Sequence, residues 1–86
     1  MYKIVLSKRA VKDAQKISNA GLKPKVTKIL ETLAEDPFKS PPFYEKLVGN
    51  LSGFYSRRIN IQHRLVYEVF KEEKTIRILS MWSHYE

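Results

Sequence analysis

Two stretches of the chain repeat their apolar residues every three or four positions, which is the spacing of an α-helix. The first predicts a helix over Lys8–Ile17, with Ser7 as its N-cap. The second predicts a helix over Leu22–Glu35, where Pro24 fits the first turn and Pro37 lies beyond the end. The apolar stripes are Ala10, Ala14 and Ile17 in the first helix, and Leu22, Val26, Ile29, Leu30 and Leu33 in the second.

The remaining apolar residues alternate with polar ones or form short β-branched runs, as in strands. Tyr2–Leu6 predicts the first strand. Thr75–Trp82 predicts the last, which is partly apolar on both faces and is therefore expected inside a sheet rather than at its edge. Asn50–Val69 predicts a hairpin, because two β-rich arms flank the polar turn Asn60–His63. Before it, Phe43–Val48 forms either a short strand or an ordered loop.

In chain order these elements read β-α-α-β-β-β. This order predicts an α+β fold in which two N-terminal helices pack on one face of a mostly antiparallel sheet. The 86 residues are expected to form one domain, residues 1–86, because no repeat, low-complexity tract or long linker divides them. Three of the four prolines lie between Pro37 and Pro42 and stiffen the connection that precedes the hairpin.

The predicted hairpin carries arginines in both arms. Ile59 and Ile61 mark the apolar face of the first arm, which leaves Arg58 on the other face. Arg64 lies on that same face, because the apolar face of the second arm is marked by Leu65, Tyr67 and Val69. Both arginines can therefore grip one phosphate. The alternative is that they are ordinary solvated residues on the wet face of a sheet.

The charge of the chain favours a polyanionic partner. Lys and Arg number 16 against 9 Asp and Glu, a net charge of +7, which suits nucleic acid or an acidic protein. The 43% apolar content excludes a disordered basic tail, and the absence of cysteine excludes disulfides and thiol chemistry. No apolar run is long enough for a signal peptide or a membrane span, so a cytoplasmic protein with no membrane partner is expected.

Most catalytic motifs are missing from the sequence. It has no glycine-rich phosphate loop, no G-x-S-x-G elbow and no H-E-x-x-H. His63 and His84 are not at metal-ligand spacing, so neither a metal nor another cofactor is expected, and His63 in the predicted turn is assigned a structural role.

The remaining residues suit metal-free cleavage of RNA. That reaction needs a base for the ribose 2′-OH, an acid for the departing 5′-oxygen, and cations for the phosphorus oxygens. Glu45 is a candidate base and His84 a candidate acid, with Arg58 and Arg64 as the cations. The alternatives are that Glu45 is a surface carboxylate and that His84 is merely exposed. Candidates for stacking on bases are Tyr44, Tyr55 and Tyr85.

A longer pattern covers the second half of the chain. Asn50–Ile59, followed by His63–Tyr67 and a terminal His84 and Tyr85, resembles the YoeB/Txe toxins, which are RelE-type toxins of bacterial toxin–antitoxin modules. The resemblance is specific over Tyr44–Tyr85, and the N-terminal half shares the order of elements. It implies a microbial-ribonuclease-like fold and a ribosome-dependent endoribonuclease that cuts mRNA in the ribosomal A site. Translation would stop as a result.

The resemblance also implies roles for particular residues. Glu45 matches the general base of the family and His84 its general acid. Arg58 and Arg64 match its phosphate-binding and transition-state arginines, and Tyr85 matches its terminal active-site tyrosine.

Two positions depart from the family pattern. Val48 stands where a lysine is common in the family. The change bears on the rate of cleavage and on phosphate binding, and Lys46 is the candidate to take the place of that lysine. Tyr55 stands where a tryptophan often precedes the arginine pair.

Arg57, the first arginine of the pair, is also predicted to bind RNA or phosphate.

The resemblance implies a YefM-like antitoxin, the ribosome and mRNA as partners, and a tendency to homodimerise. Two alternatives use no catalysis. One is a ParE-like toxin that inhibits DNA gyrase by binding, and the other is an RNA-binding module. A gyrase binder has no need of the full set of Glu45, Arg58, Arg64 and His84.

Overall fold

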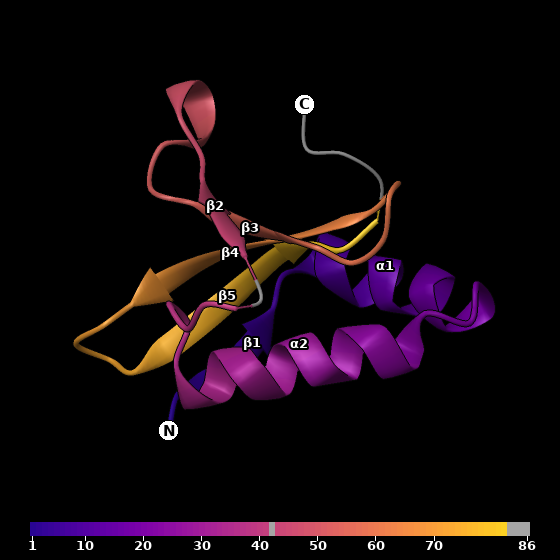
Figure 1. Ribbon diagram of the computed structural model, residues 1–86, viewed down its shortest axis with the longest axis horizontal. Helices are drawn as coiled ribbons and strands as arrows, with labels where there is room; N and C mark the ends of the chain where they lie inside the picture. Colours follow the sequence, from indigo (N-terminus) through magenta and orange to yellow (C-terminus); the bar gives the residue numbers. More distant parts are fainter. Residues whose placement is uncertain (42, 83–86) are drawn as a thin grey trace.

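The computed structural model describes residues 1–41 and 43–82, which form two helices and a five-stranded sheet of order β1-β5-β4-β3-β2. Both helices lie on one face of the sheet (Figure 1). The elements are β1 (Lys3–Leu6), α1 (Lys8–Asn19), α2 (Lys23–Glu35), β2 (Tyr44–Lys46), the 3-10 turn η1 (Gly49–Leu51), β3 (Tyr55–Arg58), β4 (Arg64–Phe70) and β5 (Thr75–Ser80). The predicted α+β class is confirmed.

The sheet contains one strand more than the predicted order. Residues 44–46 form β2, so the short strand was the right alternative for Phe43–Val48. Only β1 and β5 pair in parallel, while the other three pairs are antiparallel, as expected of a mostly antiparallel sheet. β5 lies between β1 and β4, away from both edges, in agreement with its apolar residues on both faces.

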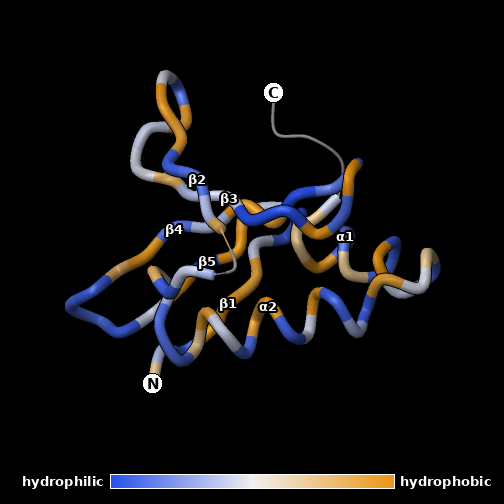
Figure 2. The backbone as a smooth tube through the Cα atoms, viewed as in Figure 1, coloured by the Kyte–Doolittle hydropathy of each residue, from blue (hydrophilic) through white to orange (hydrophobic). Residues whose placement is uncertain are grey.

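Both helices begin close to the predicted positions. The Ser7 side chain accepts a hydrogen bond of 3.0 Å from the Ala10 amide, which caps α1. The chain leaves this helix through Gly21, whose φ of +75° favours glycine. α2 starts at Lys23 with Pro24 in its first turn, and hydrophobic and hydrophilic residues alternate along it (Figure 2).

The core lies between the helices and the sheet. It joins Ala10 and Ile17 of α1 to Leu33 of α2, and the strands contribute Leu65, Tyr67, Ile76 and Ile78. Burying a large aliphatic side chain stabilises a fold by about 1.5–3 kcal/mol. This core fixes which face of β4 is covered, and so leaves Arg64 on the other face.

A buried polar network ties the proline-rich connection to the sheet. Arg57 is 1% exposed, and its Nη2 donates hydrogen bonds of 2.9 Å to the carbonyls of Pro37 and Lys39. Its Nε donates to the Tyr67 hydroxyl at 3.2 Å, and that hydroxyl donates to the Pro37 carbonyl at 3.1 Å. Burial raises the pKa of Tyr67, against the opposing effect of Arg57, so the phenol stays protonated and able to donate.

We expect Arg57→Leu to lower the free energy of unfolding by about 2–4 kcal/mol, because it removes the donor to the Lys39 carbonyl and one of the two donors to the Pro37 carbonyl in a buried region. Urea denaturation measures the change. The matched control is Arg58→Leu on the exposed face, where a surface substitution changes stability by about 0.5 kcal/mol or less. An equally small change for Arg57→Leu would show that the network is not structural.

Candidate active site

A cavity of about 410 Å³ opens on the face of the sheet that the helices leave uncovered. Its lining residues are Phe43, Glu45, Ser56, Arg58 and Arg64. They come from β2, β3 and β4 and from the residue that precedes β2. Since side chains alternate along a strand, Glu45, Ser56 and Arg58 share this face, while Arg57 points to the core.

The strand register brings the charged residues of this cavity together. Arg58 lies directly across from Arg64 in the β3–β4 pair, so the two share one face of the hairpin, as the sequence pattern predicted. Arg64 Nη1 lies 3.2 Å from Glu45 Oε1, with the two side chains 23% and 49% exposed. A pair this exposed contributes about 1 kcal/mol or less to stability.

The positive charge of the cavity exceeds its negative charge. One carboxylate, Glu45, faces two guanidinium groups, and no ion pair of Arg58 with another described residue is present. Like charges placed directly across a sheet are destabilising on their own. An anion bound between Arg58 and Arg64 would remove that repulsion, so the arrangement suits a phosphate.

Two predicted site residues lie outside this cavity. The expectation for Arg57 is corrected, because its guanidinium is buried and donates to carbonyls on the core side of the sheet. Lys46 is exposed but does not line the cavity, since it alternates with Glu45 along β2. His84 and Tyr85 lie outside the described residues.

The tyrosines proposed for base stacking form a different cluster. Tyr44 and Tyr55 pack with Phe38, with ring centroids 5.3–6.0 Å apart, and Tyr55 also stacks on Tyr67. Tyr67 belongs to the core, which places this cluster on the helix side of the sheet. The exposed aromatic ring at the cavity is Phe43, which is 80% exposed and was not singled out from the sequence.

Contacts from α1 and from the turn between β3 and β4 hold the chain just after β5, which ends at Ser80. The Asp13 carboxylate, 4% exposed, accepts a hydrogen bond of 3.0 Å from the Met81 amide. The Trp82 ring stacks on His63 at a centroid distance of 4.0 Å. His63 is itself 4% exposed, in keeping with its predicted structural role. Nothing in the local sequence around Asp13 indicated its contact with a segment 68 positions away.

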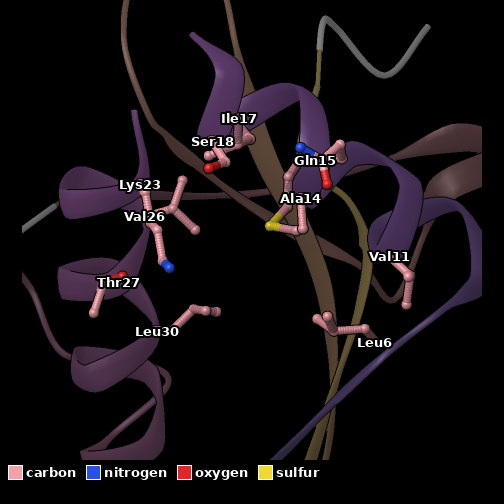
Figure 3. Close-up of a pocket in the computed structure, with 11 residues that line it drawn as sticks. Leu6, Val11, Ala14, Gln15, Ile17, Ser18, Lys23, Val26, Thr27 and Leu30 are labelled. Carbon is pink, nitrogen blue, oxygen red and sulfur yellow. The ribbon is translucent and has the colours of Figure 1, made fainter. Parts of the chain in front are cut away.

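Other cavities among the described residues are lined by neither Glu45 nor Arg64. The cavity between α1 and α2, of about 370 Å³, has mainly apolar walls and one charged lining residue, Lys23 (Figure 3). A third cavity, of about 390 Å³, borders the basic side of α1, where Lys8, Lys12 and Lys16 lie near Trp82. Within residues 1–41 and 43–82, no three His, Asp or Glu side chains gather as a metal site requires. No helix of this part is long and apolar enough to cross a membrane.

Comparisons with known proteins point to one family. The sequence model described as YoeB-like toxin of bacterial type II toxin–antitoxin systems matches residues 8–85. Toxin YoeB of Synechocystis sp. is 39% identical over 62 residues, which are 72% of this chain and 70% of that relative.

Solved structures agree with this match. A YoeB/ParE toxin from Agrobacterium tumefaciens superposes with a TM-score of 0.88 at 26% identity, covering 96% of this chain and 99% of that one. A heterotetrameric YoeB–YefM complex from Staphylococcus aureus gives 0.82 at 33% identity, covering 99% of both chains. The structure of a YoeB dimer from the same organism also gives 0.82 at 33% identity, covering 98% of both chains.

Proposed function

This chain belongs to the family of YoeB-like toxins of bacterial type II toxin–antitoxin systems, and from that membership we propose that it is an endoribonuclease that cuts mRNA on the ribosome. The observation that carries the proposal is the contact between Glu45 and Arg64 beside Arg58, in a cavity on the uncovered face of the sheet. These three side chains supply a proton acceptor and two cations, as the cleavage of a phosphodiester requires.

In the proposed reaction Glu45 takes the proton from the ribose 2′-OH. The 2′-oxygen then attacks the neighbouring phosphorus, and the bond to the 5′-oxygen breaks. Arg58 and Arg64 bind the non-bridging oxygens, where negative charge builds up. His84 protonates the departing 5′-oxygen. The products are a 2′,3′-cyclic phosphate on one fragment and a 5′-OH on the other, and the step uses no metal.

The ion pair between Arg64 and Glu45 is compatible with two roles for Arg64, which are to hold the Glu45 carboxylate and to bind the phosphate of the substrate. A guanidinium group has five N–H donors in a planar fork, so it can hold the carboxylate and an entering phosphate together. This places the proton acceptor beside the phosphate whose neighbouring 2′-OH must be deprotonated. At the rim, the exposed ring of Phe43 offers a flat surface on which a base next to the cut can stack, a contact that contributes about 1–3 kcal/mol.

Mapping mRNA ends after incubation with translating ribosomes tests the proposal. The expected result is new 5′ ends at the A-site codon, and none when the same mRNA is incubated without ribosomes. Inhibition of DNA gyrase without cleavage would instead support a ParE-like toxin. Binding to the mRNA without new ends would support an RNA-binding module.

We further propose that an acidic segment of a YefM-like antitoxin neutralises this toxin, and that the toxin also forms homodimers. The net charge of +7 and the lysines along the exposed side of α1 favour an acidic partner. A segment that folds on binding can cover a large area of such a surface. The S. aureus relatives, seen as a complex with YefM and as a dimer, support both proposals.

Co-expression with the product of the adjacent gene is expected to give a stable complex and to relieve growth arrest. Replacing Lys8, Lys12 and Lys16 with glutamate should weaken that complex by tenfold or more, because each reversal turns an attraction into a repulsion. Calorimetry measures the affinity. A toxin that expresses freely alone, without arresting growth, would contradict the proposal.

A further inference from the structure

The Ser56 hydroxyl stands out in the middle of the sheet. Ser56 is 1% exposed, and its Oγ is buried with no hydrogen-bond partner among the described residues. It is the one buried side-chain oxygen or nitrogen of that part of the chain left without a partner. Leaving a buried hydroxyl unsatisfied costs about 1–3 kcal/mol, so such a group calls for an explanation.

The position of Ser56 ties it to the candidate active site. On β3 it lies directly across from Glu45 of β2 and two residues before Arg58. It therefore shares the uncovered face with both, and it lines the same cavity. Ser56 therefore lies next to Glu45 across the β2–β3 pair, and next to Arg58 on its own strand, whose partner on β4 is Arg64.

We infer that the Ser56 hydroxyl donates a hydrogen bond to a non-bridging oxygen of the bound phosphodiester, an inference that rests on the proposed function. The hydroxyl has a donor available, and the anion gripped by Arg58 and Arg64 brings acceptor oxygens to the cavity. The carboxylate of Glu45 is held by Arg64 instead.

This donor differs from the arginines in its rigidity. Arginine side chains are long and sample many rotamers, whereas the Ser56 hydroxyl sits one bond from the Cβ of a strand residue paired on both sides. A donor fixed in the floor of the cavity selects one orientation of the phosphate. In-line attack by the 2′-oxygen depends on that orientation. Ser56 is thus assigned to phosphate orientation as well as to charge stabilisation.

The first test measures binding without cleavage. Inorganic phosphate is titrated into the wild type, Ser56→Ala and Ser80→Ala, and backbone amide shifts of β2–β4 are followed by NMR. Ser80 is the matched control, because it is a buried serine across from Val66 that does not line the cavity. We expect Ser56→Ala to weaken binding about tenfold, and Ser80→Ala to leave it unchanged. Absent binding to the wild type, or equal binding to all three proteins, would overturn the inference.

The free energy of unfolding of Ser56→Ala separates a role of Ser56 in phosphate binding from a role in holding the fold together. Removing an unsatisfied hydroxyl without changing the shape of the side chain is expected to leave the free energy of unfolding unchanged or to raise it. A serine needed for the fold would instead lose stability on the same substitution. Urea denaturation of Ser56→Ala and the wild type decides between them.

The second test uses cleavage on ribosomes with three mRNAs: the natural phosphodiester and the two phosphorothioate diastereomers at the cleaved bond. Ser56→Ala should slow the natural substrate by about 10²-fold, as for loss of one donor to a developing oxyanion. For the diastereomer whose sulfur replaces the contacted oxygen, the effect should nearly vanish, since sulfur is the weaker acceptor. Equal slowing of all three would overturn the inference. Absence of cleavage by the wild type would overturn the proposed function alone, because phosphate binding is measured separately.

Discussion

Replacing Arg64 with alanine is expected to lower the rate of mRNA cleavage by about 10²–10³-fold, the usual loss for one electrostatic donor to a transition state. Ribosome affinity should fall much less. The physical reason is that, in the proposed reaction, the charge on the phosphorus oxygens develops during cleavage, so the interaction with Arg64 is expected to be strongest in the transition state. Single-turnover cleavage rates, compared with ribosome binding by sedimentation, separate the two effects.

Two further variants sharpen this prediction. Arg64→Lys should restore only part of the rate, because a lysine cannot hold Glu45 and a phosphate with one planar fork. Arg77→Ala is the matched control, since Arg77 forms a similar cross-strand ion pair of 3.2 Å with Glu68 and does not line the cavity. Equal losses of rate and affinity in Arg64→Ala would make Arg64 a docking residue.

That Arg58 and Arg64 share one face of the hairpin was predictable from local sequence. This prediction requires only the alternation of side chains along each strand, whereas the register that sets them directly across from each other comes from the structure. The same rule places Ser56 on that face, but alternation alone does not tell a solvated serine from a buried one. The 1% exposure of Ser56 is a result of tertiary packing, which alternation along a strand does not describe.

The burial of Arg57 depends on hydrogen-bond partners that local sequence does not reveal. From the sequence it is predicted to bind RNA or phosphate, but in the structure it lies on the core side of β3, where a charged residue is unfavourable unless it has partners. Those partners are the carbonyls of Pro37 and Lys39, about 20 positions away, in a connection with no periodic pattern. Strand β2, with three residues, is likewise too short for a pattern of its own and exists because it pairs with β3.

The last prediction concerns the acid–base pair. Glu45→Gln and His84→Gln are each expected to lower turnover by about 10²-fold or more, the usual contribution of a general acid or base. Imidazole titrates near neutral pH and can therefore supply a proton at cellular pH. The domain should stay folded, since Glu45 is half exposed and its ion pair contributes little stability. Glu68→Gln, on β4 of the same sheet and outside the cavity, is the control.

The chemistry of the RNA ends makes this prediction decisive. Attack by the 2′-OH leaves a 2′,3′-cyclic phosphate upstream and a 5′-OH downstream, whereas attack by water can leave a 5′-phosphate. A polynucleotide kinase labels a 5′-OH directly, so the two outcomes are distinguished in one assay. The double variant of Glu45 and His84 should lose less than the product of the two single losses, because the pair acts as a unit. Downstream fragments that carry 5′-phosphates would exclude the cyclising reaction, and the roles proposed for Glu45 and His84 with it.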